Sequence, residues 1–515
     1  MSFLNRPRAE STLSSRRSPS ALHSRLAGAV IAMGLMVATA RAADSPVADA
    51  AEGQDAAAVR TLLGQKADVN ATQADGMTAL HWGAYHDDPE LVKQCLEAGA
   101  RAGAANEYGV TPLSLACTNG SEAVVRLLLN AQADPNETLA GGETALMTAA
   151  RTGRVGPVRL LLERGARIDA RERKGQTALM WAAADGNLDV VDALLKAGAD
   201  FRTPLASGFT PLFFAVREGR STVVFRLLEA GVDVNAPTQP AGKNGKALTP
   251  LILAIENGHF ELAVHLLEAG ADPDRRPAGY TPLHAIALMR KPIRGDGDPP
   301  PRGSGRLSSL DLVRALVERG AEVDRPLEKG SSGRGRFTTT GSTPFLLAAR
   351  SGDMPLMRLL LERKADARLP NADKSSPLLA AAGVGALGDG DEAAATEEEA
   401  MAAVRMLLDL GADINAVDDN GETVLHGAAY QSWSKLVPLL AEHGAKSEVW
   451  DRKNKWGWTP LMIAQGHRPG NFRPSPETIV AIERVLRRDA ERTVPGTGAD
   501  AASQQKPSGS PAAPR

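Results

Sequence analysis

Cysteine is nearly absent from this sequence, with Cys95 and Cys117 as the only two in 515 residues. Two thiols form one bridge at most, which excludes a disulfide-rich scaffold and a zinc site with four cysteine ligands. Both residues occupy apolar positions of predicted helices in neighbouring segments. We therefore expect two buried free thiols, with a single disulfide between them as the alternative.

A strong charge of either sign is missing as well. The 59 Lys and Arg residues nearly balance the 61 Asp and Glu residues, for a net charge of -2. This balance does not favour nucleic acid as a partner. Beyond residue 40, no stretch approaches the 18 consecutive apolar residues that a membrane-spanning helix needs. We expect no membrane insertion of the processed chain.

The N-terminal segment has the order of an export signal. Arginines precede the apolar run LAGAVIAMGLMVATA, and the small-residue sequence A-R-A ends at Ala42. This order predicts a bacterial signal peptide over residues 1–42 and an exported protein, either periplasmic or secreted. The pair Arg16-Arg17 allows a twin-arginine signal as an alternative, but polar residues follow it where that signal is usually apolar.

Internal repetition dominates the rest of the chain. The phrase TALH at residue 78 returns as TPLS at 111, TALM at 144, TALM at 177 and TPLF at 210, each time after 33 residues. Related phrases begin at 249, 281, 343, 376, 423 and 459. A second phrase of the type LLERGA follows at a fixed distance. A repeat of this length predicts stacked supersecondary units that share one continuous core.

These phrases and this period resemble the ankyrin repeat. The resemblance implies an all-α solenoid of about twelve stacked repeats over residues 43–490, each repeat a helix-turn-helix with a β-hairpin loop, and a disordered tail over 491–515. The residues agree with it physically. The Thr-Pro pair is typical of a helix start, and the Gly of the second phrase is typical of a left-handed helix end.

Four insertions interrupt the period, at 237–248, 290–309, 326–342 and 384–398. Glycine, proline and serine predict mobile loops in the hairpins and in the 290–309 turn. The acidic segment at 384–398 is expected to extend its helix backwards. Insertions in hairpins and in helix turns are predicted at opposite edges of the solenoid. The basic turn and the acidic segment are expected roughly 20 Å apart, beyond a Debye length of about 8 Å.

Histidine and aromatic residues are the candidates for a site. The resemblance implies that His81, His284 and His426, each the fourth residue of its tetrapeptide, brace the hairpin, and Trp82 falls at a packing position. Other aromatic residues fall at variable positions on the expected concave face, where ankyrin repeats contact partners. The predicted partner-binding residues are Tyr85, His86, Tyr108, Phe209, Tyr280, Tyr430, Trp456 and Trp458.

No catalytic residues, cofactor-binding residues or metal ligands are predicted, because the sequence carries no phosphate-binding glycine loop, no H-E-x-x-H and no G-x-S-x-G. The resulting hypothesis is an exported scaffold that binds another protein through its concave face and is not an enzyme. Two alternatives stay open. One is an accessory or regulatory subunit of a periplasmic enzyme, and the other is a catalytic protein with a site in the inserted loops.

Overall fold

The computed structural model describes residues 45–239, 246–291, 303, 305–330, 337–386, 395–467 and 473–493. The signal peptide expected at 1–42 lies outside the described residues. The chain divides into two compact units, with unit 1 ending at Ala140 and unit 2 beginning at Gly141. Within the described residues every regular element is a helix, which confirms the predicted all-α repeat fold.

From residue 45 onward, where the structure describes it, unit 1 contains three helix pairs. In each pair the first helix begins at the tetrapeptide position and the second helix runs back against it. The pairs are α2 (Pro46–Glu52) with α3 (Ala56–Gly64), α4 (Ala79–Tyr85) with α5 (Pro89–Glu97), and α6 (Pro112–Asn119) with α7 (Glu122–Asn130).

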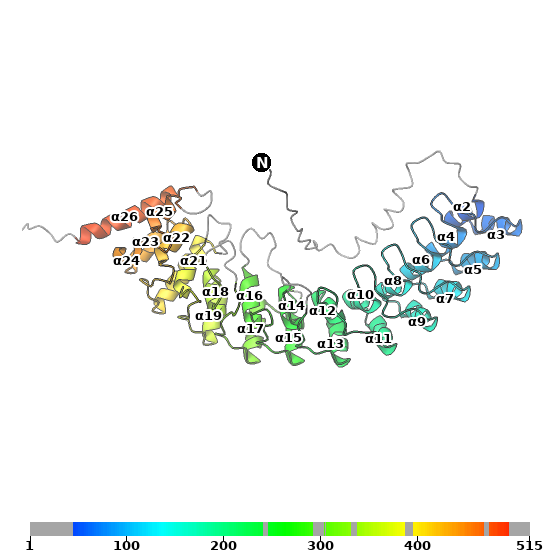
Figure 1. Ribbon diagram of the computed structural model, residues 1–515, viewed down its shortest axis with the longest axis horizontal. Helices are drawn as coiled ribbons and strands as arrows, with labels where there is room; N and C mark the ends of the chain where they lie inside the picture. The colour runs from blue at the N-terminus through cyan, green and yellow to red at the C-terminus, as the bar shows by residue number, and fades with distance from the viewer. Residues whose placement is uncertain are drawn as a thin grey trace, which may run out of the picture. The chain divides into compact units, whose positions relative to one another are not determined.

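The described part of unit 2 repeats this arrangement nine times, and Figure 1 shows most of its first helices side by side in one row and most of its second helices in another. The first helices are α8 (Ala145–Thr152), α10 (Ala178–Asp185), α12 (Pro211–Arg217), α14 (Pro250–Glu256), α16 (Pro282–Arg290), α18 (Pro344–Arg350), α20 (Pro377–Ala381), α22 (Val424–Tyr430) and α25 (Pro460–Ala464). The second helices are α9 (Val155–Glu163), α11 (Leu188–Lys196), α13 (Ser221–Glu229), α15 (Phe260–Glu268), α17 (Ser309–Glu318), α19 (Met354–Glu362), α21 (Glu397–Asp409), α23 (Leu436–Glu442) and α26 (Pro476–Thr493), with the short α24 (Ser447–Trp450) before the last pair. Helix α26 continues past residue 490, where the tail was expected to begin.

The Thr-Pro pairs start the first helices as predicted. The Thr111 hydroxyl accepts a hydrogen bond from the Ser114 backbone N–H at 3.2 Å, and Pro112 occupies the first turn, where no backbone donor is needed. Glycine ends most of the second helices in the left-handed region, while Lys66, Gln132 and Lys364 adopt it after α3, α7 and α19. Gly99, with φ of +88° after α5, shows this conformation, which other residues adopt at a cost.

The hairpin tips join neighbouring repeats through main-chain hydrogen bonds. In unit 1 the Glu107 N–H donates to the carbonyl of Asp75 at 3.0 Å. Gly76, beside it, has a φ of +84°, and a Cβ there would lie 2.9 Å from the Glu107 nitrogen. The tip therefore requires glycine both for its conformation and for the close approach of the next hairpin.

The insertion at 326–342 differs from the mobile loop that its composition predicted. Residues 331–336 lie outside the described residues, but Phe337 is only 2% exposed and packs with Leu346 and Ala380. The Arg350 guanidinium lies 4.5 Å from the centre of the Phe337 ring. One large aromatic side chain thus anchors a segment otherwise rich in glycine and serine, because burying its ring outweighs the cost of ordering the backbone next to it.

Two further expectations about the insertions are wrong. A Cβ at Gly385 would lie 2.7 Å from the Phe337 nitrogen, so a hairpin insertion and a helix-turn insertion meet instead of lying at opposite edges. The basic and acidic insertions also touch, since Lys291 Nζ lies 2.5 Å from Glu399 Oε1. The expected separation of roughly 20 Å assumed the regular spacing of the repeats. In the structure the helix that ends at Arg290 and the helix that begins at Glu397 bring Lys291 and Glu399 together.

The first residue of the 290–309 insertion is structural. Arg290 ends α16, and its guanidinium contacts the carboxylate of Asp353 through Nε at 2.6 Å and Nη2 at 3.0 Å. Most of this loop, residues 292–302 and 304, lies outside the described residues. Its end is held where the Arg306 N–H donates to Glu261 Oε1 at 2.6 Å.

The acidic segment extends its helix backwards, as predicted. Helix α21 is 13 residues long, with Thr396 as N-cap and Glu399 closing a capping box. The preceding helix α20 is correspondingly short, at 5 residues. After it the chain turns through Gly383 and Gly385, both at positive φ, and passes directly over Gly427 of α22.

Candidate protein-docking face

The tetrapeptide histidines are scaffold residues, as predicted. Nδ1 of His81 lies 2.8 Å from the Thr78 hydroxyl and accepts the Thr78 N–H, and Nε2 lies 3.1 Å from the Val110 carbonyl. Because a carbonyl can only accept, Nε2 carries the proton. His284 and His426 make the same contacts, with the carbonyls of Ser342 and Trp458. Each imidazole therefore ties a helix start to the next hairpin.

These histidines predict a loss of stability in mild acid. Burial lowers the pKa of His284 and of His426 from 6.5 to about 4. Between these values the unfolded chain binds more protons than the folded chain, so stability is complete above pH 6.5 and falls as the pH drops toward 4. From pH 7.5 to 4.5 we expect each histidine to cost about 2.5 kcal/mol. Urea unfolding at both pH values measures this loss.

The control for this prediction is His284→Asn, which keeps a hydrogen-bonding side chain but cannot titrate. The variant should be less stable than the parent at pH 7.5 and should lose less on acidification. An equal loss in parent and variant would attribute the pH dependence to carboxylates instead.

Three rings form a cluster at the end of α4 in unit 1. The Trp82 ring stacks on His86 with centroids 5.7 Å apart and planes at 22°, and Tyr85 meets both rings edge-on at 5.6 and 5.2 Å. Trp82, predicted to pack, is half-buried. Tyr85 is 41% exposed, and Tyr108 at the next hairpin tip is 57% exposed. These two tyrosines present large rigid surfaces to solvent.

A polar network holds this ring cluster in place. The Trp82 Nε1 donates to Gln73 Oε1 at 2.7 Å. His86 Nε2 donates to the Glu52 carbonyl at 3.1 Å, and its Nδ1 accepts from Gln54 Nε2 at 2.9 Å. Both ring nitrogens of His86 thus form hydrogen bonds within the chain, and the residue can contact a partner only through the face and carbon edge of its ring. The repeat pattern did not reveal this network, because it depends on side chains at variable positions.

The predicted residues of unit 2 are less exposed. Phe209 is half-buried against Phe213 and Phe214, at centroid distances of 5.7 and 5.6 Å. Tyr280 is half-buried, and its hydroxyl donates to Glu256 Oε1 at 2.7 Å; burial, with the Glu256 charge, raises its pKa. Trp456 and Trp458 are half-buried and stack with centroids 6.2 Å apart and planes at 24°.

The prediction of an exposed position for Tyr430 is wrong. Its side chain is 1% exposed, and its hydroxyl donates to Glu422 Oε1 at 2.7 Å. Asn454 Nδ2 lies 3.1 Å from both oxygens. The Glu422 acceptor and the Asn454 donor are both buried, so the ring turns inward and its hydroxyl pairs with both, although Tyr430 stands at the same repeat position as the exposed Tyr85.

A small cavity of about 60 Å³ lies in unit 2 among the ends of the first helices. Its wall includes Trp433, Lys291 and Gln431, and the buried Gln431 Oε1 has no hydrogen-bond partner in the described part of the chain. The sequence signal for this site is the Gly383-Val384-Gly385 turn beside it, which sequence analysis did not single out.

Other site types find no support in the described ranges. Cys95 and Cys117 are buried free thiols, as predicted, and burial raises the pKa of each to about 12. Among the described residues, no three histidine, cysteine or acidic side chains gather as a set of metal ligands. No described helix combines the length and the apolar character that crossing a membrane requires.

Comparison with known proteins gives a family and several relatives that match over a short stretch of their length. The model for ankyrin repeats in three copies matches residues 47–139, 132–205, 173–238, 212–294 and 392–471, and the single-repeat model matches 340–369. Over 212 residues the chain is 29% identical to Neurogenic locus notch homolog protein 1 of Xenopus tropicalis, which is 37% of this chain and 8% of that protein.

Two more relatives show the same pattern. Neurogenic locus notch homolog protein 2 of Homo sapiens is 35% identical over 212 residues, 35% of this chain and 8% of that protein. The E3 ubiquitin-protein ligase KEG of Arabidopsis thaliana is 29% identical over 145 residues, 28% of this chain and 8% of the ligase. The likeness thus spans only a small part of each relative. Because the family models cover most of the chain and the structure repeats their helix pair, the chain belongs to the ankyrin-repeat family.

Proposed function

We propose that this chain binds another protein through its first-helix face, defined as the exposed sides of the first helices together with the hairpin tips. Ankyrin repeats generally mediate protein-protein interaction, and the family matches indicate no catalytic family. The observation that carries the proposal is the exposure of Tyr85 and Tyr108, at 41% and 57%. Tyrosine and tryptophan are enriched among the residues that dominate interface energies.

The face is ordered before binding. Hydrogen bonds fix Trp82 and His86, and main-chain bonds between hairpins fix the tips. A pre-ordered surface loses little entropy on association, so its contacts contribute more fully to affinity. The proposed partner is a protein, and neither a cofactor nor catalytic chemistry is part of the proposal.

The test is a triple variant, Tyr85→Ala with Tyr108→Ala and Trp458→Ala, used against the partner captured by the tagged parent chain. Each true hot spot should cost about 2 kcal/mol, a roughly thirtyfold loss of affinity. Leu410→Ala is the control, because Leu410 is 42% exposed but follows a second helix. A triple variant that folds and binds as tightly as the parent would exclude this face.

Export is the second part of the proposal. The charged, apolar and small-residue order of residues 1–42 supports cleavage near Ala42 and a periplasmic or secreted bacterial protein. An accessory role beside a periplasmic enzyme is one form that this binding function could take. N-terminal sequencing of the mature chain tests the cleavage, and a product that retains the first forty residues would refute it.

A further inference from the structure

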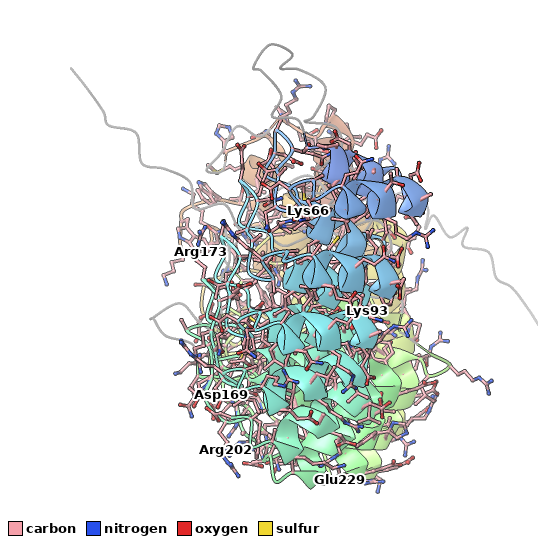
Figure 2. The ribbon with its side chains drawn as sticks, turned by 90° about the vertical axis from the view of Figure 1, so that its right-hand side faces the viewer. Lys66, Lys93, Asp169, Arg173, Arg202 and Glu229 are labelled. Atoms are coloured by element: carbon pink, nitrogen blue, oxygen red, sulfur yellow. The ribbon has the colours of Figure 1, made fainter. Side chains whose placement is uncertain are left out.

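The basic residues in the described part of unit 1 are confined to its second helices and the turns after them, whereas acidic residues occur on both helix rows. Residues 45–140 contain 13 Asp and Glu against 5 Lys and Arg, a net charge of -8. All five basic residues lie on second helices or in the turns after them. They are Arg60, Lys66, Lys93, Arg101 and Arg126, of which Figure 2 labels Lys66 and Lys93. The first helices and hairpin tips of unit 1 therefore carry no Lys or Arg.

The exposed rings stand among acidic residues on this face. Asp49 and Glu52 on α2 are exposed, and Gln73 Nε2 donates to Asp49 Oδ1 at 2.9 Å and to Glu52 Oε2 at 2.7 Å. The same Gln73 accepts from Trp82, so the two carboxylates and the ring cluster belong to one network. At the tip, Tyr108 follows the exposed Glu107 directly.

The charges of Asp49 and Glu52 are not neutralised by this network. Their hydrogen-bond donor Gln73 is an uncharged amide, and within the described residues no Lys or Arg forms an ion pair with either carboxylate. Aromatic faces attract cations through their quadrupole, and neighbouring carboxylates add to the attraction. The rings and the carboxylates on this face thus both favour a cationic occupant.

We propose that the first-helix face of unit 1 docks a Lys- or Arg-rich segment of the partner protein. A cationic side chain would lie against the rings of Trp82, Tyr85 and His86, close to the Glu52 carboxylate, and a second would reach Tyr108 and Glu107. The inference rests on the proposed binding function and specifies the chemistry of the partner. The negative charge of unit 1 then attracts and orients that segment.

The probe is a fluorescent peptide of alternating lysine and glycine, with a peptide of alternating glutamine and glycine as reference. Fluorescence anisotropy with the full chain should show binding of the lysine peptide only. The affinity should fall steeply between about 50 and 500 mM salt, as the Debye length shortens from roughly 14 to 4 Å. Equal binding of the glutamine peptide, or no binding of the lysine peptide, would overturn the proposal.

Two pairs of variants distinguish a contribution of this face from an effect of net charge alone. Asp49→Asn with Glu52→Gln should weaken binding at least tenfold and flatten the salt dependence. Glu97→Gln with Glu122→Gln removes the same charge from second helices and should change affinity less than twofold. Equal losses in the two pairs would reduce the effect to net charge and refute a docking site.

The captured partner keeps this inference distinguishable from the proposed function. If the partner binds the Asp49→Asn, Glu52→Gln variant as tightly as the parent but loses affinity for the tyrosine variants, the basic segment is refuted while the first-helix face stands. If the tyrosine variants bind the partner normally, the proposed function fails as well. Circular dichroism of each variant checks that the helices are retained.

Discussion

Replacement of Arg290 by alanine is expected to lower the free energy of unfolding of unit 2 by about 3 to 5 kcal/mol. Its partner Asp353 has a side chain only 2% exposed, and the pair is closed at 2.6 Å. Without the guanidinium, a buried carboxylate loses its countercharge and retains its desolvation cost. The Asp353 side chain also caps α19 by accepting from the Leu356 N–H, so the disturbance reaches the start of that helix.

The geometry explains why one side chain has so large a predicted effect. Arg290 ends α16, its Nη1 lies 2.5 Å from the Ser309 hydroxyl at the start of α17, and its other nitrogens contact Asp353 before α19. Three helices on both sides of an insertion therefore depend on it. Urea unfolding followed by circular dichroism measures the loss, read from the transition of unit 2 because stacked repeats can unfold in steps.

Arg314→Ala is the matched control for this prediction. Arg314 also pairs with an aspartate, Asp311, at 2.8 Å, but both side chains are 44% exposed, so its removal should cost less than about 1 kcal/mol. The double variant Arg290→Met with Asp353→Asn should lose less than the sum of the two single changes, since neither buried charge remains. A cost below about 1 kcal/mol for Arg290→Ala would contradict the predicted role of the pair.

Gly427→Ala should destabilise unit 2 by about 3 kcal/mol. A Cβ at this position of α22 would lie 2.4 Å from the carbonyl oxygen of Ala382 and 2.7 Å from the nitrogen of Val384. Both atoms belong to backbone, so no side-chain rotation relieves the clash. The turn after α20 has to move, and its contacts with Trp433 and Gln431 move with it.

Gly64→Ala provides the comparison, because it makes the same chemical change in a helix where nothing lies within 4 Å of the added Cβ. Alanine is the better helix former, so this variant should gain up to about 1 kcal/mol. Opposite signs for the two substitutions in thermal or urea unfolding are the expected result. A neutral Gly427→Ala would mean that the turn over α22 is loosely packed.

The repeat explains why much of the fold was predictable. Thr111 and Pro112 start a helix through local hydrogen bonding and backbone geometry, and Gly99 ends one for the same kind of reason. The hydrogen bonds of His81 reach only from Thr78 to Val110 in the next hairpin. Such features depend on neighbours at a constant sequence distance, so the period carries their information.

The insertions interrupt that period, and the sequence lost its predictive power there. Phe337 was hidden in a run of glycine, serine and threonine, yet it packs as core. Lys291 and Glu399 form an ion pair although 108 positions separate them. Contacts of this kind depend on where two irregular segments come to lie, which no local pattern encodes.

Only part of the aromatic face was predicted correctly, because exposure there depends on neighbouring side chains that the repeat pattern does not specify. Tyr85 and Tyr430 share one position in the repeat, yet one is exposed and the other buried. Their difference arises from Glu422, whose buried carboxylate accepts from the Tyr430 hydroxyl, and from Asn454, whose buried amide donates to it. Gly427 was a usable sequence signal that this repeat packs differently, because glycine stands there at the repeat position where Trp82 has a bulky ring.

The contact between Phe337 and Gly385 has a consequence for the footprint of any partner on unit 2. Phe337 occupies space over α18 and α20, beside Leu346 and Ala380, so this part of the first-helix face is already covered by the chain itself. The turn after α20 also passes over α22, every residue of which is buried. A partner that follows the repeats meets one accessible stretch from α8 to α16 and another from α25 onward. Hydrogen-exchange protection by such a partner should therefore fall in two separate blocks, with helices α18, α20 and α22 unchanged between them.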